Sequence, residues 1–286
     1  MGVNVQIHDR KTLVMGARSG IGRLVLEQLI ADGRPVRAST RSPQPGQFPD
    51  GLDVVAADLT DRASLDAAFA GIGRVFLFAN REGVPDVIAA AGEAGVERVV
   101  LLSSGSVIHP SSVGNRIAQE HREVEDALAT AGHLTVVPIR PLVLATNALG
   151  WAHPIRATGS VSIYQPDALT APIHERDVAA VAVAALAGRD DVSGILTGPE
   201  RLSQRAQVAA IGAAIGREIS VAELSREQAA ADFARFMPEW EAEAVLQFLD
   251  DAAVDNSIAT GTVEAVLGRP ATSFARWALD HADDFR

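Results

Sequence analysis

Short apolar runs alternate with segments of helical spacing along the first half of the chain. Residues 12–16 form an apolar run that stops at a glycine-rich turn, and residues 21–30 follow with apolar positions at helical spacing. The pattern recurs, with strands predicted at 35–40, 53–57, 74–79, 98–103 and 134–139 and helices at 63–70, 85–94 and 119–131. These strands are continuously apolar, as in a sheet covered on both faces. The alternation therefore predicts an α/β fold with a Rossmann-type doubly wound parallel sheet.

The pattern loosens after about residue 145. Strands are predicted at 161–164, 195–197 and near 219–222, helices at 178–186 and 203–215, and three or four further helices before the C-terminus. We expect a dinucleotide-binding domain over residues 1–145. A smaller α/β, mostly helical lobe over residues 146–286, partly interleaved with the first domain, is expected to bind the substrate.

Composition narrows the function classes. The chain has 286 residues and a net charge of −11, which disfavours nucleic acid as a partner. It has no cysteine, so thiolate chemistry and Cys-ligated metals are excluded. Residues 1–10 do not resemble a signal peptide, and the longest apolar stretch, 178–188, is too short to span a bilayer. We expect a cytoplasmic protein without membrane contacts, and a homodimer remains open.

A glycine motif provides the strongest chemical signal. Gly16, Gly20 and Gly22 stand where the first strand turns into the first helix, with Arg18, Ser19 and Ile21 between them. Glycine permits the tight turn and lets a pyrophosphate approach the free N–H groups of the helix N-terminus. The motif therefore predicts a dinucleotide site, although turns also collect glycine.

The second strand favours NADP(H) over NAD(H). Residues 37–42 read RASTRS and lack the acid that commonly holds the ribose hydroxyls of NAD. Arg41 can bind a 2′-phosphate, and Arg18 can reach it from the glycine turn, unless both simply face solvent. Asp58, after the third strand, is placed to accept a hydrogen bond from the adenine amine or to cap the following helix, for which Thr60 is a second N-cap candidate.

The chain resembles the short-chain dehydrogenase/reductase superfamily, in particular its atypical NmrA-like branch. The matching segments include GARSGIGR (16–23), VRASTRS (36–42), AGVERVVLLSS (94–104), IRPLVL (139–144) and HERDVAAVAVAAL (174–186). The G-x-x-x-G-x-G spacing follows the main superfamily, whereas most NmrA-like members have glycine where Ser19 stands. The resemblance spans nearly the whole chain and implies binding of NADP(H) or NAD(H).

The catalytic pattern of the superfamily is incomplete. Its Tyr-x-x-x-Lys would fall at Ile117 and His121, and a Tyr–Lys pair on one helix is excluded because Lys11 and Tyr164 are the only residues of their types. His121 is the first candidate for a proton donor or a ribose contact, with a surface histidine as the alternative. Ser103 and Ser104 match the position of the superfamily's serine, and Ser104 could polarise a substrate carbonyl or make ordinary turn hydrogen bonds.

The resemblance also implies that the Pro141–Val143 backbone contacts the nicotinamide amide and that Asn147 lines the substrate entrance. Leu59, Ala79 and Asn80, beside the ends of the third and fourth strands, complete the predicted cofactor contacts. Tyr164 is predicted to line the substrate pocket. Apolar residues of the C-terminal helices are predicted to form core or to cover that pocket: Phe233, Phe236, Met237, Trp240, Phe248 and Leu249.

His174, Glu175 and Asp177 lack a recognised metal-ligand spacing, and Asp177 is predicted to be a helix N-cap, so no metal is predicted. The leading hypothesis is an NADPH-dependent oxidoreductase that transfers hydride to a quinone, enone or ketone. Its small-molecule substrate is expected to be apolar or aromatic. Two alternatives stay open. One is a regulatory protein that senses NADP(H), and the other is a non-redox isomerase, dehydratase or cyclase on the same scaffold.

Overall fold

The computed structural model describes residues 10–18 and 20–286, and Ser19 and the first nine residues lie outside the described part. The chain forms two compact units that interleave along the sequence. The first unit comprises the described residues up to Ser103, together with Glu120–Arg140 and Val178–Gly194. The second comprises Ser104–Gln119, Pro141–Asp177 and Ile195–Arg286. The units are comparable in length. Residues 104–119 and 141–145, predicted in the first domain, belong to the second unit, and residues 178–194 belong to the first.

A seven-stranded sheet has the order β3-β2-β1-β4-β5-β6-β9, which confirms the Rossmann-type fold. Its strands are β1 (Lys11–Val14), β2 (Val36–Thr40), β3 (Asp53–Ala56), β4 (Ile72–Phe78), β5 (Arg98–Leu102), β6 (Thr135–Pro141) and the short β9 (Ile195–Leu196). Pairing from β3 through β6 is parallel, with Leu13 opposite Arg37 and Val75. This arrangement brings the carboxyl ends of the strands to one edge.

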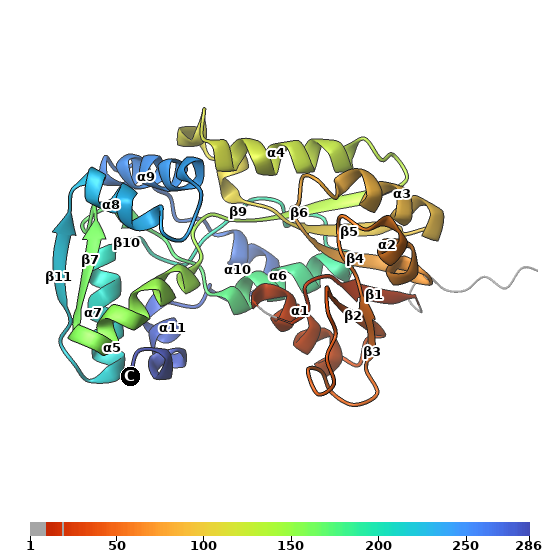
Figure 1. Ribbon diagram of the computed structural model, residues 1–286, viewed down its shortest axis with the longest axis horizontal. Coiled ribbons are helices and arrows are strands. Elements are labelled where there is room, and N and C mark those ends of the chain that lie inside the picture. Colours follow the sequence, from red (N-terminus) through yellow and green to blue (C-terminus); the bar gives the residue numbers. More distant parts are fainter. Residues whose placement is uncertain (1–9, 19) are drawn as a thin grey trace, which may run out of the picture. The chain divides into compact units, whose positions relative to one another are not determined.

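Helices cover both faces of this sheet. They are α1 (Gly20–Ala31), α2 (Arg62–Phe69), α3 (Val84–Ala94), α4 (Arg116–Ala129) and α6 (Glu175–Leu186). Figure 1 shows α2, α3 and α4 over one face and α1 and α6 over the other. Phe69, Leu65 and Leu128 are fully buried in the core between the sheet and the helices α2, α3 and α4. Continuously apolar strands need such cover on both faces of the sheet.

Two predicted helix caps are wrong. The helix α2 begins at Arg62 and is capped by Asp61, whose side chain accepts a hydrogen bond from the Ala63 N–H, so Thr60 lies one residue too early. Asp177 lies inside the first turn of α6, which begins at Glu175. The Asp177 carboxylate instead accepts hydrogen bonds from the N–H and the hydroxyl of Thr272.

The second unit is mostly helical. It contains α5 (Ala152–Thr158), α7 (Gln204–Ile215), α8 (Arg226–Phe233), α9 (Glu239–Ala253), α10 (Thr262–Leu267), α11 (Phe274–Asp280) and the 3-10 turns η2 (Gly105–Val107), η3 (Pro110–Ser112), η4 (Ala145–Trp151) and η5 (Ala282–Asp284). Two small sheets pair β7 (Ser160–Tyr164) with β11 (Ser220–Leu224) and β8 (Leu169–Thr170) with β10 (Leu202–Ser203). Its core is built around Trp277, which is fully buried and stacks on Phe274.

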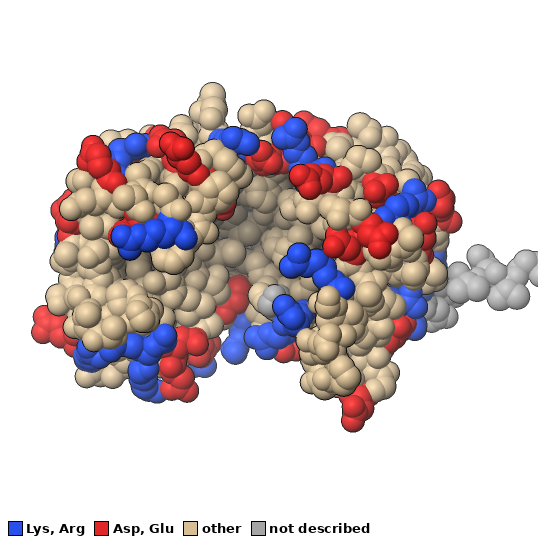
Figure 2. Space-filling view, in the orientation of Figure 1, with Lys and Arg blue, Asp and Glu red and all other residues tan. Residues whose placement is uncertain are grey.

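Charge is distributed rather than concentrated. Figure 2 shows acidic and basic side chains intermixed over the face in view. Among the described residues no helix is both long enough and apolar enough to cross a membrane.

Candidate functional site

A glycine turn, Met15–Arg18 and Gly20–Gly22, connects β1 to α1. Gly16 and Gly20 adopt positive φ angles of 61° and 57°, a region that favours glycine. A Cβ atom at Gly22 would lie 2.6 Å from the Gly16 carbonyl oxygen, and one at Gly16 would lie 2.5 Å from the Phe78 ring. The turn therefore has no room for side chains at these two positions, and it keeps the N-terminus of α1 against the strand.

Two arginines beside the turn remain exposed. Arg18 follows the first glycine and Arg41 follows β2, and neither guanidinium makes an ion pair within the described part of the chain. The nearby Arg37 is used differently. It pairs with Asp53 at 3.0 Å and donates to carbonyls at the C-terminus of α2, so it serves the fold.

Asp58 is half-buried at the carboxyl end of the sheet. Its Oδ1 accepts hydrogen bonds from the N–H and hydroxyl of Thr60 at 2.9 and 2.8 Å. These bonds lower the pKa of Asp58, and the charge of Arg41 lowers it further, so the carboxylate is ionised at neutral pH. The described contacts engage only Oδ1.

Leu59, Ala79 and Asn80, the predicted cofactor contacts after β3 and β4, lie in segments held by hydrogen bonds and close packing. The Asn80 side chain accepts a hydrogen bond from the Gly83 N–H at 2.9 Å, and Gly83 packs directly against the backbone of Leu59. The Ala79 N–H donates to the Leu102 carbonyl and continues the pairing of β4 with β5. These contacts fix the entry to α3 without consuming the Asn80 amide nitrogen.

Ser103 belongs to a buried ionic cluster. Its hydroxyl donates to Glu125 at 2.6 Å, and the same carboxylate receives two hydrogen bonds from Arg140 at 3.0 and 2.5 Å. Arg140 also donates to the Ser193 carbonyl. The Ser103 hydroxyl is therefore committed to the first unit's own structure, and of the two serines only Ser104 keeps its hydroxyl beside a cavity.

His121 lies on α4 in the first unit. Its Nδ1 is buried and has no hydrogen-bond partner among the described residues. Burial lowers the pKa of His121 below 6.5, and the charges of Glu125 and Glu120 oppose this shift only in part. The ring is therefore mainly neutral at pH 7.

The second unit contains a cavity of about 960 Å³, a volume suited to a small organic molecule. Predicted residues Ser104, Val143, Asn147 and Tyr164 all line it. We refer to the apolar side chains of its lining as the apolar wall: Trp151, Phe233, Phe236, Met237, Phe248 and Leu249. We refer to the hydroxyl and amide groups of its serine-rich segment as the polar wall: Ser104, Ser106, Ser111, Ser112 and Asn115. Pro141 is the last residue of β6, and the following N–H of Leu142 donates to Leu196.

Tyr164 presents its phenol within this cavity. The hydroxyl donates to Asp250 at 2.5 Å, and burial and this carboxylate together raise the pKa of Tyr164. Its proton is already engaged, so the oxygen is available to a ligand chiefly as an acceptor. Of the apolar C-terminal residues predicted to form core or to cover the pocket, all but Trp240 line the cavity, whereas Trp240 lies under the Arg116 guanidinium at 4.4 Å. Trp151 was not predicted there.

Sequence reasoning missed the polar wall and its acidic neighbours. Ser106, Ser111, Ser112 and Asn115 lie in one serine-rich segment, a composition that was visible but matched no motif. The cavity lining also includes Asp232, Glu241 and Asp251, which come from α8 and α9. No sequence signal could have placed these three carboxylates at one cavity.

His174 and Glu175 hold the C-terminal helix. Glu175 accepts hydrogen bonds from Trp277 at 3.0 Å and from His281 at 2.8 Å, while His174 approaches Asp280 at 3.4 Å. Burial opposes ionisation of Glu175, but its hydrogen bonds with His174 and His281 prevail and bring its pKa to about 2.

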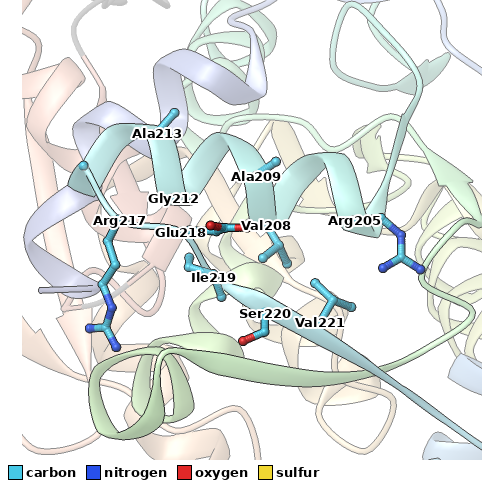
Figure 3. Close-up of a pocket in the computed structure, with 11 residues that line it drawn as sticks. Arg205, Val208, Ala209, Gly212, Ala213, Arg217, Glu218, Ile219, Ser220 and Val221 are labelled. Carbon is cyan, nitrogen blue, oxygen red and sulfur yellow. The ribbon is translucent and has the colours of Figure 1, made fainter.

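A second concavity of about 600 Å³ lies along α7 and β11 (Figure 3). Arg205 and Arg217 lie at its opposite ends, and Gly212 and Ala209 of α7 line it between them. None of the predicted site residues that the structure describes lines it.

Comparison with known proteins decides the family. A family model described as NAD(P)H-binding matches residues 16–189, more than half of the chain. The chain belongs to this NAD(P)H-binding family. The resemblance to NmrA-like short-chain dehydrogenases and the prediction of an NAD(P)(H) cofactor are thereby confirmed.

Two curated relatives cover 96% of the chain and 98% of their own length. One is a (4-alkanoyl-5-oxo-2,5-dihydrofuran-3-yl)methyl phosphate reductase from Streptomyces griseus, 37% identical over 283 residues. The other is an NAD(P)H azoreductase from Xenophilus azovorans, 30% identical over 289 residues. The chain is accordingly classed with the NAD(P)H-dependent reductases.

The fold has a solved counterpart. An NADPH-dependent quinone oxidoreductase from Escherichia coli, complexed with NADPH, has a TM-score of 0.78 to this chain at 22% identity. The match covers 94% of this chain and 98% of that one. At this identity it supports the shared fold and no more.

Proposed function

We propose that the chain is an NADPH-dependent reductase that transfers hydride to an apolar conjugated acceptor, namely a quinone, enone or ketone. The observation that carries this proposal is the cavity of about 960 Å³ in the second unit, whose apolar wall suits an aromatic or acyl substrate. A formed cavity with both apolar and hydroxyl walls favours an enzyme over a sensor of cofactor redox state.

In this proposal the glycine turn binds the pyrophosphate. The N–H groups near Gly16, Arg18, Gly20, Ile21 and Gly22 would face it at the start of α1, and close packing at Gly22 would let the phosphates approach. Arg41, with Arg18, would hold the 2′-phosphate, because two exposed guanidinium groups suit a phosphate dianion. Asp58 would accept from the adenine amine.

The remaining cofactor contacts are assigned to the ends of β4, β5 and β6. Leu59, Ala79 and Asn80 would pack beside the ribose and pyrophosphate, and Ser103, Pro141 and Val143 would contribute backbone toward the nicotinamide. When bound, the cofactor supplies the hydride.

The acceptor chemistry falls to Ser104 and the cavity walls. Its hydroxyl exchanges a hydrogen bond with Ser106 at 2.8 Å, so Ser104 can donate to a substrate oxygen while Ser106 donates to it. Asn147 and Tyr164 would orient the substrate. Acceptor, NADPH and one proton give reduced product and NADP⁺. Because the His121 ring is mainly neutral at pH 7, we assign the proton to water and His121 to the ribose contact.

The test is consumption of NADPH by the purified chain with a panel of quinones, enones and aryl ketones, followed by loss of absorbance of the reduced cofactor. We expect turnover with at least one class and a preference for NADPH over NADH. Saturable NADPH binding without turnover across the panel would reject the reductase assignment and favour a sensor. Product without oxidised cofactor would favour an isomerase, dehydratase or cyclase.

A further inference from the structure

We propose that the cavity of the second unit selects substrates without negative charge, and so excludes the phosphate ester class named for the Streptomyces relative. This inference rests on the proposed function, since it describes the substrate of the same site. It separates this chain from a relative that is 37% identical.

The formal charges of the lining carry the argument. Among the described lining residues, Asp232, Glu241 and Asp251 are acidic and Arg235 is the one arginine or lysine. The Arg235 side chain is 71% exposed and lies 3.4 Å from Asp232, so its charge is already offset. Glu241 and Asp251 are left without a cation in the lining. A phosphate site usually has the opposite composition, with Arg or Lys forming charge-assisted hydrogen bonds.

The polar wall offers hydroxyl and amide donors to phosphate oxygens. Asp251 lies close to that wall. The Ser111 hydroxyl lies 2.9 Å from Nδ1 of His109. Burial lowers the pKa of His109, and the negative charge of Asp251 opposes this shift, so Asp251 acts on the same ring. The Asn115 amide already donates to Ala244 on α9. A phosphate placed here would meet neutral hydroxyls and a carboxylate.

The other end of the cavity is also rich in acceptors. The Tyr164 hydroxyl gives its proton to Asp250, and Arg226, the nearest guanidinium to that pair, is itself bound by Glu243 and Asp250. A neutral conjugated acceptor, or one with a cationic substituent, meets no repulsion at either end. We therefore expect the order cationic or neutral substrate first and phosphate ester last.

A matched pair of compounds tests this order. The substrates are a (4-alkanoyl-5-oxo-2,5-dihydrofuran-3-yl)methanol and its phosphate ester, which differ only in the phosphate. We expect kcat/KM for the alcohol to exceed that for the phosphate by at least about tenfold, because like charges in one site are strongly unfavourable. Raising ionic strength should narrow the ratio. An equal or higher value for the phosphate would overturn the inference.

Variants locate the effect. Glu241→Gln and Asp251→Asn should each raise the ratio of kcat/KM for the phosphate to kcat/KM for the alcohol about three- to tenfold. Glu239→Gln is the matched control, since Glu239 is exposed on the same helix and does not line the cavity. Equal gains for alcohol and phosphate would point to a general change in the site and would also overturn the inference.

Binding separates this inference from the proposed function. Trp151 lines the cavity, so quenching of its fluorescence, obtained by difference from a Trp151→Phe variant, reports ligand binding to the NADP⁺-loaded chain without turnover. Suppose that neither compound nor any quinone is reduced, but the alcohol binds at least about tenfold more tightly than the phosphate. The proposed reaction is then rejected, whereas the inference of charge selection is supported. If the phosphate binds as tightly, the charge selection fails whatever the turnover.

Discussion

The glycine turn and the cavity of the second unit are built from different materials. The turn consists of backbone held at fixed spacing within eight residues, with Gly22 packed on the carbonyl of Gly16. The cavity consists of side chains from segments between Ser104 and Asp251, brought together by folding. Cofactor binding by backbone depends on a few positions, and each of them tolerates little change. Substrate binding by side chains spreads the binding energy over many residues. We therefore expect single substitutions in the turn to weaken cofactor binding strongly, and single substitutions in the cavity to weaken acceptor binding by smaller amounts.

The largest effect is expected for Gly22→Ala. The added Cβ would meet the Gly16 carbonyl at 2.6 Å, and neither backbone group can move without opening the turn. We expect the Kd for NADPH to rise on the order of 100-fold, with a loss of unfolding free energy of about 1–3 kcal/mol. Titration calorimetry and urea unfolding measure the two. Gly132→Ala is the control, because nothing lies within 4 Å of a Cβ there. Equal losses in both variants would mean that the close approach is unimportant.

Arg41→Ala should separate the two nicotinamide cofactors. A charge-assisted hydrogen bond contributes about 1.5–3 kcal/mol, so the Kd for NADPH should rise about 10- to 100-fold while that for NADH stays within twofold. Arg23→Ala provides a matched control, since Arg23 is exposed and its ion pair within the described part of the chain is with Glu27. Loss of affinity for both cofactors alike would assign Arg41 to folding rather than to the 2′-phosphate.

Phe248→Ala probes the apolar wall of the cavity. Phe248 is half-buried, and losing its contact with an aromatic substrate should raise KM about tenfold with kcat nearly unchanged. Phe236 lines the same wall but is 84% exposed, so Phe236→Ala should change KM by less than about threefold. If the two variants behave alike in steady-state kinetics, the enclosed part of the cavity does not hold the acceptor.

Tyr164→Phe should have a small effect on turnover. Because the phenol proton is bound to Asp250, removing the hydroxyl takes away its hydrogen bonds with Asp250 and Gln165, of about 1 kcal/mol or less each, and no proton donor. We expect kcat to stay within about threefold at pH 7. A drop in kcat beyond 100-fold, with an unchanged Kd for NADPH, would make Tyr164 the acid after all.

His121 gives the smallest expected signal, in the pH dependence of stability. Its folded-state pKa is lowered below 6.5 by burial, so as the pH falls through that value the unfolded chain gains a proton that the folded chain resists. Stability should therefore fall toward acid, by up to about 1.4 kcal/mol per pH unit. Urea unfolding at pH 7.5 and 5.5 should show a smaller difference for His121→Gln than for wild type. His133→Gln, at an exposed position of the same unit, should leave the wild-type difference in unfolding free energy between the two pH values unchanged.

The same contrast explains what the sequence could predict. Gly16, Gly20 and Gly22 stand at set distances after an apolar strand, so the turn and the doubly wound parallel sheet could be predicted. The family and its cofactor followed from that pattern. Asp232, Glu241 and Asp251 lie on helices whose packing depends on the whole second unit, so their shared cavity could not be predicted. The helix start at Glu175 was missed because His174, not Asp177, accepts from a free N–H of that first turn.

The interleaving of the two units has a consequence for how such proteins diversify. The chain passes between units after Ser103, Gln119, Arg140, Asp177 and Gly194, so no single cut yields one intact half. A gene fragment ending near residue 145 would omit most of α6 from the unit it was meant to encode. Exchange of the substrate lobe by recombination would require several simultaneous junctions. New specificities on this scaffold are therefore expected to arise by accumulated point mutations within the lobe, with the nucleotide half inherited alongside it.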